Sequence, residues 1–251
     1  MQTGSVSLLG TRIDTLSWEQ ALGRIVRWAQ KGQSRMVCLC NVHVVISARR
    51  DHALGRALQL ADMAAPDGAP LAWLMRKTGW PEQQRISGPD LMWQVAGEAQ
   101  RLQLPIFLLG GTDTTLTQLT HALQQAFPDL VIADTFSPPF REQSLEEDAQ
   151  LEERINRSGA RLLLVGLGCP KQELWMSAHR GRVQCVMLGV GAAFDYHAGV
   201  LPRAPLHWQR LGLEWLYRLW REPTRLLRRY LVTNSLFLLA LPRELWKRPR
   251  H

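Results

Sequence analysis

Residues 161–173 read RLLLVGLGCPKQE. The apolar run that begins after Arg161 predicts a strand at residues 161–165 that is buried on both faces. A glycine-bearing turn follows this run, and residues 170–180 have the apolar spacing of a helix. A buried strand, a glycine turn and a helix in this order are typical of a parallel α/β sheet.

The same order recurs along the chain. Further apolar runs predict strands at residues 36–40, 62–65, 105–109, 130–133 and 183–188. Helical periodicity is found at residues 42–61, 68–78, 89–102, 114–127 and 145–157. Because crossovers between parallel strands are right-handed, the sequence predicts an α/β fold with a mostly parallel sheet and helices on both faces.

Polar residues and glycines follow five of the predicted strands. Asn41 follows the first, and glycine-bearing turns follow four others, at residues 66–68, 110–112, 166–171 and 189–191. In a doubly wound sheet these segments meet at the carboxyl edge, where ligands bind. One such turn is explained equally well as an ordinary connection, but four on one edge favour a pocket for a nucleotide or a sugar phosphate.

Two nucleotide-binding motifs are missing. The turn after residue 165 begins like a dinucleotide fingerprint, but Lys171 stands at its third glycine position. A Walker A motif is absent as well. NAD binding is therefore not expected, and no cofactor is predicted.

The charge of the chain is concentrated at its C-terminal end. The chain has 30 Lys and Arg residues against 22 Asp and Glu, and residues 200–251 hold eleven of the basic and three of the acidic ones. This segment therefore carries the whole net charge of +8, while residues 1–199 are neutral. The asymmetry indicates an anionic partner for the segment: a nucleic acid, an anionic membrane surface or a phosphorylated substrate.

Cysteine spacing and hydropathy exclude other classes. The cysteines are Cys38, Cys40, Cys169 and Cys185. They form no CxxC pair, so neither structural zinc nor a disulfide framework is expected, and a reducing cytoplasm is the expected compartment. The first ten residues lack the pattern of a signal peptide. The apolar segment 236–241 is far shorter than the roughly 20 residues that a membrane-spanning helix needs.

Asp67 lies in the sequence ADMAAPDG (61–68), directly after a predicted strand. A carboxylate held there, on the ligand edge of the sheet, could act as a general base that takes a proton from a sugar hydroxyl. Aspartate is also a favoured N-cap, so Asp67 could instead cap the following helix. The two roles are compatible, and the sequence leaves both open.

The segment GCPKQE (168–173) suits an anion site. Pro170 fits a first helical turn, and free N–H groups together with Lys171 would attract a phosphate. Gln172 could read the edge of a uracil or a sugar. The alternative is a solvated first turn in which Glu173 interacts with the helix dipole.

The C-terminal segment predicts an amphipathic helix that Pro223 divides in two. At 100° per residue one arc is basic, and it contains Arg218, Arg221, Arg225, Arg228 and Arg229. The opposite arc is apolar, with Trp215, Leu216, Leu219, Leu226, Leu227 and Tyr230. Arginines beside Trp and Leu suit a membrane interface or a diphosphate. The alternative is a helix packed on the core with a solvated basic face.

Several motifs resemble those of one glycosyltransferase family. They are GPDL (88–91), LGG (109–111), GLGCPKQE (166–173), GVGAAFD (189–195), and RAP (203–205) followed by LGLEWLYRL (211–219). In order and spacing they are similar to the WecG/TagA/CpsF family, from about residue 9 to residue 230.

This resemblance implies a Rossmann-like core at residues 1–199 and a basic helical appendage at residues 200–251. It implies inverting transfer of a sugar from a UDP donor to an undecaprenyl-diphosphate-linked sugar, in the biosynthesis of bacterial cell-surface polysaccharide. The protein would be peripheral at the cytoplasmic face of the inner membrane. The resemblance also implies metal independence, which agrees with the absence of a DxD motif.

The resemblance assigns roles to single residues. Asp67 matches the proposed catalytic base. The positions implicated in holding the donor match Asn41, Arg85, Gln172 and Asp195. The arginines implicated at the lipid diphosphate resemble Arg218, Arg221 and Arg225. From the glycine turns and the basic arc we add Gly110, Gly111, Gly168 and Lys171 to the donor site, and Arg228 and Arg229 to the lipid surface.

One departure concerns Leu39, where many members of the family carry threonine. A hydroxyl contact to the donor is thereby lost, and N-acetylmannosamine, its uronic acid and glucose all stay open as donor sugars. The oligomeric state, a homo-oligomer included, is also open. Two other classes compete with a transferase: a nucleotide- or RNA-binding module with a basic arm, and an NAD-dependent nucleotide-sugar epimerase or dehydrogenase. The apolar face of the tail argues against an RNA arm, so no nucleic-acid partner is expected.

Overall fold

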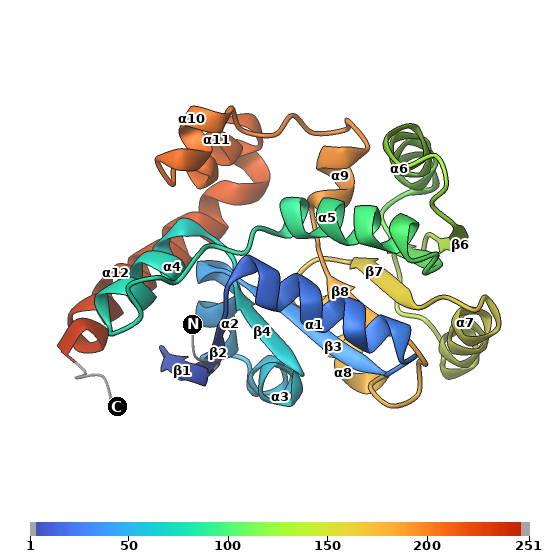
Figure 1. The fold of residues 1–251 in the computed structure, drawn as a ribbon. Helices are drawn as coiled ribbons and strands as arrows, with labels where there is room; N and C mark the ends of the chain where they lie inside the picture. Colours follow the sequence, from blue (N-terminus) through green and yellow to red (C-terminus); the bar gives the residue numbers. More distant parts are fainter. Residues whose placement is uncertain (1–3, 247–251) are drawn as a thin grey trace.

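A six-stranded parallel sheet forms the centre of the computed structural model, which describes residues 4–246. The strands are β3 (Arg35–Cys40), β4 (Met63–Pro66), β5 (Ile106–Gly110), β6 (Ile132–Phe136), β7 (Leu162–Gly166) and β8 (Val186–Gly189). They lie in the order β4-β3-β8-β7-β5-β6 (Figure 1). Each neighbouring pair is parallel, so all carboxyl ends lie at one edge.

Helices cover both faces of this sheet. Buried side chains of one cluster come from α1 (Trp18–Gln30), α5 (Gly88–Arg101), α6 (Asp113–Ala126) and α9 (Ala193–His197). The other cluster comes from α2 (Val42–Ala48), α3 (His52–Leu60), α4 (Ala69–Lys77), α7 (Leu145–Arg157) and α8 (Lys171–Ala178). Leu162 and Leu164 of β7 join the first cluster, and Leu163 and Val165 the second, as the alternation of a strand requires. The predicted Rossmann-like α/β fold is confirmed.

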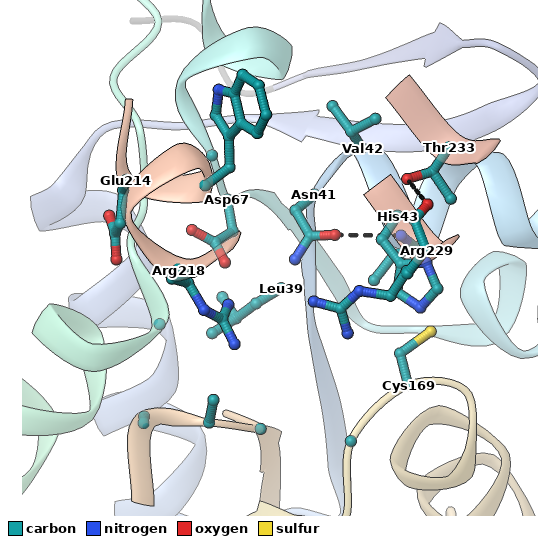
Figure 2. Close-up of a pocket in the computed structure, with 18 of the residues that line it drawn as sticks. Leu39, Asn41, Val42, His43, Asp67, Cys169, Glu214, Arg218, Arg229 and Thr233 are labelled. Carbon is teal, nitrogen blue, oxygen red and sulfur yellow. Dashed lines mark hydrogen bonds between the residues drawn. The ribbon is translucent and has the colours of Figure 1, made fainter. Parts of the chain in front are cut away.

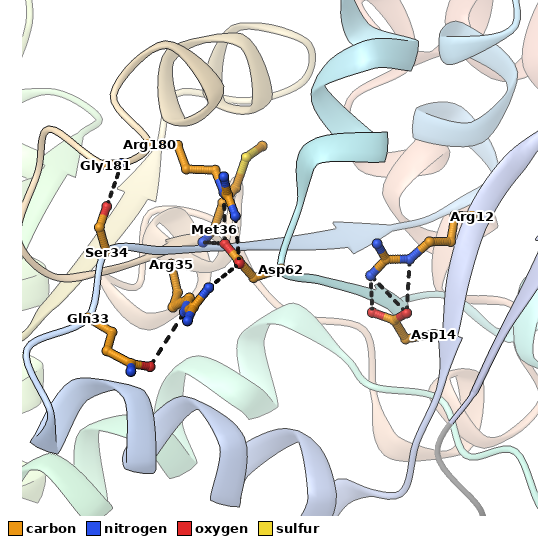
Figure 3. Close-up of polar contacts among 9 residues, drawn as sticks. All are labelled: Arg12, Asp14, Gln33, Ser34, Arg35, Met36, Asp62, Arg180 and Gly181. Carbon is orange, nitrogen blue, oxygen red and sulfur yellow. Dashed lines mark hydrogen bonds and ion pairs between the residues drawn. The ribbon is translucent and has the colours of Figure 1, made fainter.

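A short antiparallel hairpin precedes the sheet and was not predicted. It consists of β1 (Gly4–Leu8) and β2 (Thr11–Thr15). The Asp14 carboxylate accepts a hydrogen bond of 2.9 Å from the Ala64 N–H of the edge strand β4. Arg12 holds this carboxylate at 3.0 Å (Figure 3). The hairpin therefore occupies part of an edge that would otherwise offer unpaired backbone groups.

Asp62 fixes the start of β4. Its carboxylate contacts Arg35 at 2.8 Å and Arg180 at 2.9 Å, and it accepts a hydrogen bond from the Met36 N–H (Figure 3). These contacts join the beginnings of β3 and β4 to the turn that follows α8. The edge strand is thus anchored at its amino end, while Asp67 follows its carboxyl end.

Three helices end the described chain: α10 (Leu206–Arg210), α11 (Glu214–Arg221) and α12 (Pro223–Trp246). Pro223 begins α12, which confirms the predicted division at this proline. α12 lies along α2 (Figure 1), and its buried side chains are Leu226, Tyr230, Thr233, Phe237 and Glu244. Within residues 4–246 no helix has both the length and the apolar character needed to span a bilayer.

The appendage was predicted to run from residue 200 to residue 251. Its residues 247–251, which include Lys247, Arg248 and Arg250, lie outside the described part of the chain. The boundary at residue 200 stays a prediction.

Three predicted elements need correction. A single helix at residues 42–61 is wrong, because the chain breaks after Ala48 and the Asp51 side chain caps a new helix by accepting from the N–H groups of Ala53 and Leu54. The strand predicted at 130–133 begins at residue 132 and continues to 136. The strand predicted at 183–188 begins only at residue 186.

Candidate active site

A cleft of about 750 Å³ opens at the carboxyl ends of β3, β4, β7 and β8. One wall consists of the turns that follow these strands, and α11 and α12 form the opposite wall. The volume lies in the range of small-molecule sites. Its position is the one at which doubly wound sheets bind ligands.

Asp67 lies in the core wall of this cleft. Its backbone N–H donates to the Cys40 carbonyl at 2.8 Å, and Gly68, at φ +93°, turns the chain into α4. Gly68 itself is the N-cap residue, and α4 has no side-chain cap, so the alternative that Asp67 caps the helix is wrong. The carboxylate is directed into the cleft instead (Figure 2).

Burial raises the pKa of Asp67 above its ordinary value of 3.8. Glu214 also raises this pKa, whereas Arg85, Arg218 and the Gly68 N–H lower it. A base is most effective when its pKa approaches the working pH, so this environment suits proton abstraction.

Arg85 lies beside Asp67, in the segment between α4 and α5. The Ile86 N–H donates to the Pro66 carbonyl at 2.9 Å, which holds this segment next to the end of β4. The Arg85 Nη2 atom is 2.6 Å from Glu214 Oε2, and the Arg85 Nε atom is 3.8 Å from Asp67 Oδ1. An appendage residue thus reaches the guanidinium that the sequence assigned to the donor.

Asn41 and Gln172 line the cleft but hydrogen bond within the protein. The Asn41 Oδ1 atom caps α2 by accepting from the Val44 N–H at 3.2 Å, which leaves its NH2 group directed toward the cavity (Figure 2). Gln172 accepts from the Gly168 N–H at 3.2 Å and donates to the buried Glu173 at 2.8 Å. Gln172 therefore shapes the turn at 166–170, since both ends of its amide are already occupied.

The opposite wall presents arginines. Arg218, Arg225 and Arg229 all line the cleft, and Arg218 and Arg229 extend from opposite sides toward Asp67 and Asn41 (Figure 2). Arg225 pairs with Glu222. The buried Nε atoms of Arg218 and Arg229 have no hydrogen-bond partner among the described residues.

Tyr196, which also lines the cleft, has a buried hydroxyl without a partner in the same part of the chain. Its ring lies 5.5 Å from the Arg218 guanidinium. Buried polar groups are costly unless they bind something, so this cluster is suited to an anionic ligand. Burial and the neighbouring Arg229 lower the pKa of His43 to about 4, which keeps this lining residue neutral at pH 7.

The cleft has an apolar end. It is formed by Val42, Trp73, Phe237, Leu238 and Leu241, which come from α2, α4 and α12. Leu238 is 63% exposed, so the apolar end reaches the molecular surface. The cleft therefore combines a charged half near Asp67 with a hydrophobic half along α12.

The structure brings most of the predicted residues together. Those that line the cleft are Asn41, Asp67, Arg85, Gly111, Gly168, Gln172, Asp195, Arg218, Arg225 and Arg229. Those that do not line it are Gly110, Lys171, Arg221 and Arg228. As the division at Pro223 predicts, the basic arc is split between two helices, α11 and α12, and only some arginines of each face the cleft.

Sequence reasoning missed the contact of Glu214 with Arg85, the unpaired Tyr196 hydroxyl and the apolar end of the cleft. Tyr196 could have been noticed, because it directly follows the motif GVGAAFD. The other two depend on contacts between distant parts of the chain. Among residues 4–246 no group of three or more His, Cys, Asp or Glu side chains is arranged to hold a metal ion.

The fold and the cleft define a Rossmann-like α/β protein with a cavity between the sheet edge and a helical appendage. The chain belongs to the WecG/TagA/CpsF family of glycosyl transferases, whose model matches residues 6–251. The family implies a nucleotide-sugar donor and a lipid-linked acceptor.

Proposed function

We propose that the protein is an inverting, metal-independent glycosyltransferase that moves a sugar from a UDP donor to a sugar on undecaprenyl diphosphate. One observation carries this proposal: Asp67, a partly buried carboxylate with a raised pKa, faces arginines whose Nε atoms lack partners among the described residues. Single displacement with an anionic leaving group needs a base for the acceptor hydroxyl and positive groups that stabilise the departing anion. N-acetylmannosamine, its uronic acid and glucose are the candidate sugars.

The reaction we propose is a single displacement. The acceptor hydroxyl oxygen attacks the anomeric carbon from the face opposite UDP, and Asp67 accepts the hydroxyl proton. The bond between the anomeric carbon and the phosphate oxygen breaks, and UDP leaves with the electron pair. The backbone of the glycine turns and Arg85 would stabilise the diphosphate that departs.

The acceptor lipid would lie along α12. Arg225 and Arg229 come from the first turns of this helix, and Phe237, Leu238 and Leu241 form the apolar end of the cleft further along it. A diphosphate with a hydrocarbon tail has the same succession of charge and apolar surface. This match supports a polyprenyl diphosphate as the acceptor carrier.

We further propose that the protein docks on the cytoplasmic face of the inner membrane through the outer side of α12. Leu231 and Leu239 there are 60% and 77% exposed, and Leu238, at the mouth of the cleft beside them, is 63% exposed. A groove beside α12 is also lined by Arg49, Arg50, Arg56 and Arg243. Exposed leucines flanked by arginines suit an anionic bilayer surface.

Membrane binding through the outer side of α12 can be tested against the rival function of an RNA-binding module. Co-sedimentation with vesicles of phosphatidylglycerol and phosphatidylethanolamine should deplete the protein from solution, while vesicles of phosphatidylcholine should retain less of it. An RNA gel shift serves as the comparison. Tight RNA binding without vesicle binding would favour the rival class.

The decisive experiment is incubation with a panel of UDP-sugars and short-chain lipid-diphosphate sugar acceptors. Mass spectrometry should detect one acceptor that gains one hexose-type residue and an equal amount of UDP. NMR of the product should show the anomeric configuration opposite to that of the donor. Retention of configuration, or hydrolysis of the donor without transfer, would contradict the proposed mechanism.

A further inference from the structure

We propose that Glu214 is a positioning residue that keeps Arg85 from forming a closed ion pair with Asp67, so that the appendage sets the state of the base. This proposal rests on the function proposed above. It concerns a residue of the motif LGLEWLYRL (211–219) to which the sequence assigned no role.

The contacts of Arg85 carry the proposal. Its guanidinium lies between two carboxylates, 2.6 Å from Glu214 and 3.8 Å from Asp67. Arg85 and Glu214 side chains are only 23% and 12% exposed, so solvent weakens this pair little. The buried Arg85 Nε atom, which faces Asp67, has no hydrogen-bond partner within residues 4–246.

An arginine with a single carboxylate in reach commonly closes onto it with two hydrogen bonds. This chain provides an example, since Arg203 contacts the two oxygens of Asp90 at 2.5 and 2.8 Å. If Arg85 bound Asp67 in this way, the carboxylate would be a weaker base. Glu214 prevents this closure because it holds Arg85 by the Nη2 atom.

The charge of Glu214 also favours a stronger base at Asp67, as its contact with Arg85 does. The groups that face it are Arg85 from the segment before α5, Glu214 and Arg218 from α11, and the Gly68 N–H. Glu214 raises the pKa of Asp67, whereas Arg85 and Arg218 lower it. Loss of the Glu214 charge should therefore lower the pKa of Asp67 in two ways. The negative charge that raises this pKa is gone, and Arg85, which lowers it, is free to approach.

Glu214 begins α11, whereas Arg85 and Asp67 belong to the core. The base consequently reaches its working state only when α11 is docked against the sheet edge. Figure 2 shows Glu214, Asp67 and Arg218 grouped at one side of the cavity. The docked appendage thus contributes to the reaction through the base, in addition to its arginines.

The test compares Glu214→Gln, Glu214→Asp and a control, Asp90→Asn. Glu214→Gln keeps the shape and removes the charge, so the acidic limb of the pH profile of kcat should move to lower pH. Its plateau kcat should fall by about tenfold or more, because Asp67 becomes a weaker base. Glu214→Asp should restore the position of the limb and part of kcat. Asp90→Asn loosens the contact of Arg203 with the first turn of α5, so it should lower Tm without moving the limb.

A second readout does not need turnover. The ¹³C carboxyl signal of Asp67, assigned by its loss in Asp67→Asn, should titrate at lower pH in Glu214→Gln and as in the wild type in Glu214→Asp. An equal midpoint in wild type and in folded Glu214→Gln would overturn the role of Glu214. Full activity of Asp67→Asn would instead overturn the proposed function, and the carboxyl titration would still report on Glu214.

Discussion

Apart from Arg85 and Tyr196, the core wall of the cleft offers backbone turns and side chains that are largely bonded within the protein. The wall formed by α11 and α12 instead offers arginines whose buried Nε atoms lack partners within residues 4–246. Asn41 caps a helix and Gln172 closes a turn, and residues 1–199 carry no net charge. Arg218 and Arg229 retain buried Nε atoms without partners in the described chain. The comparison indicates that the core supplies mainly shape and the appendage most of the positive charge, and the proposed base Asp67 lies where the two walls meet.

The largest effect is expected at Asp67 itself. Asp67→Asn should lower kcat by about 10²- to 10⁴-fold, because the proton acceptor is lost. The affinity for UDP, measured by calorimetry, should stay close to that of the wild type. An unchanged kcat would rule out the assignment and leave the core wall without a base.

The same substitution should stabilise the fold at neutral pH. The pKa of Asp67 is raised above 3.8 in the folded protein, so the folded state binds the proton more tightly than the unfolded state does. The ionised carboxylate therefore costs stability once the pH rises above its unfolded pKa. Asparagine removes this cost, and Tm at pH 7 should increase.

The next largest effect is a difference in stability between variants on the inner side of α12 and variants on its outer side. Phe237 is 6% exposed and joins the core, so Phe237→Ala should reduce the free energy of unfolding by about 3–5 kcal/mol. Leu239 is 77% exposed, and Leu239→Ala should change it by less than about 0.5 kcal/mol. Denaturant unfolding measures both, and vesicle co-sedimentation should weaken only for the Leu239 variant. Equal unfolding effects would show that α12 is not fastened by its inner side.

A smaller effect is expected from the charge of the appendage wall. Arg229→Gln should raise the KM for the lipid-diphosphate acceptor by about 10- to 100-fold, the value of one charge-assisted hydrogen bond. The KM for the donor should change little. Arg210→Gln, at an exposed arginine outside the cleft, is the matched control. An equal rise of the acceptor KM in both variants would mean that the net charge of the appendage matters and the position of Arg229 in the cleft does not.

The smallest effect concerns the core alone. Gly23 is exposed within α1, and an added Cβ would meet no atom within 4 Å. Gly23→Ala should therefore stabilise the fold by about 0.5–1 kcal/mol, the difference in helix propensity. Both KM values should stay constant, since α1 does not line the cleft. A change in acceptor KM would show that the two walls are more closely linked than the comparison assumes.

Much of the core could be predicted because its signals are local. The apolar run before Gly166 and the buried strand before Asp67 identify β7 and β4 from sequence alone. The helix at 145–157 was predicted with its observed limits, because its apolar residues recur at helical spacing among polar ones. The hairpin at residues 4–15 was missed, because its strands are short and its turn at Leu9 and Gly10 is not one of the usual hairpin pairs.

The site divides in the same way. Asp67 and Asn41 could be predicted because each follows a strand, and sheet topology brings such positions together. The contact between Arg85 and Glu214 joins residues 129 positions apart, and no local pattern reports it. The division of the basic arc at Pro223 could be predicted, but helical periodicity alone does not show which arginines of each helix face the cleft.

α12 extends over 24 residues, about 36 Å at the rise of an α-helix. Arg225 and Arg229 stand near its first turn, and Leu245 and Trp246, both exposed, stand at its last. Pro242 near the far end removes one backbone N–H, but the turns before it form a hydrogen-bonded helix that is stiff enough to act as a lever. If the exposed end of α12 meets a bilayer as proposed above, a tilt of the helix would shift the guanidinium groups that line the cleft.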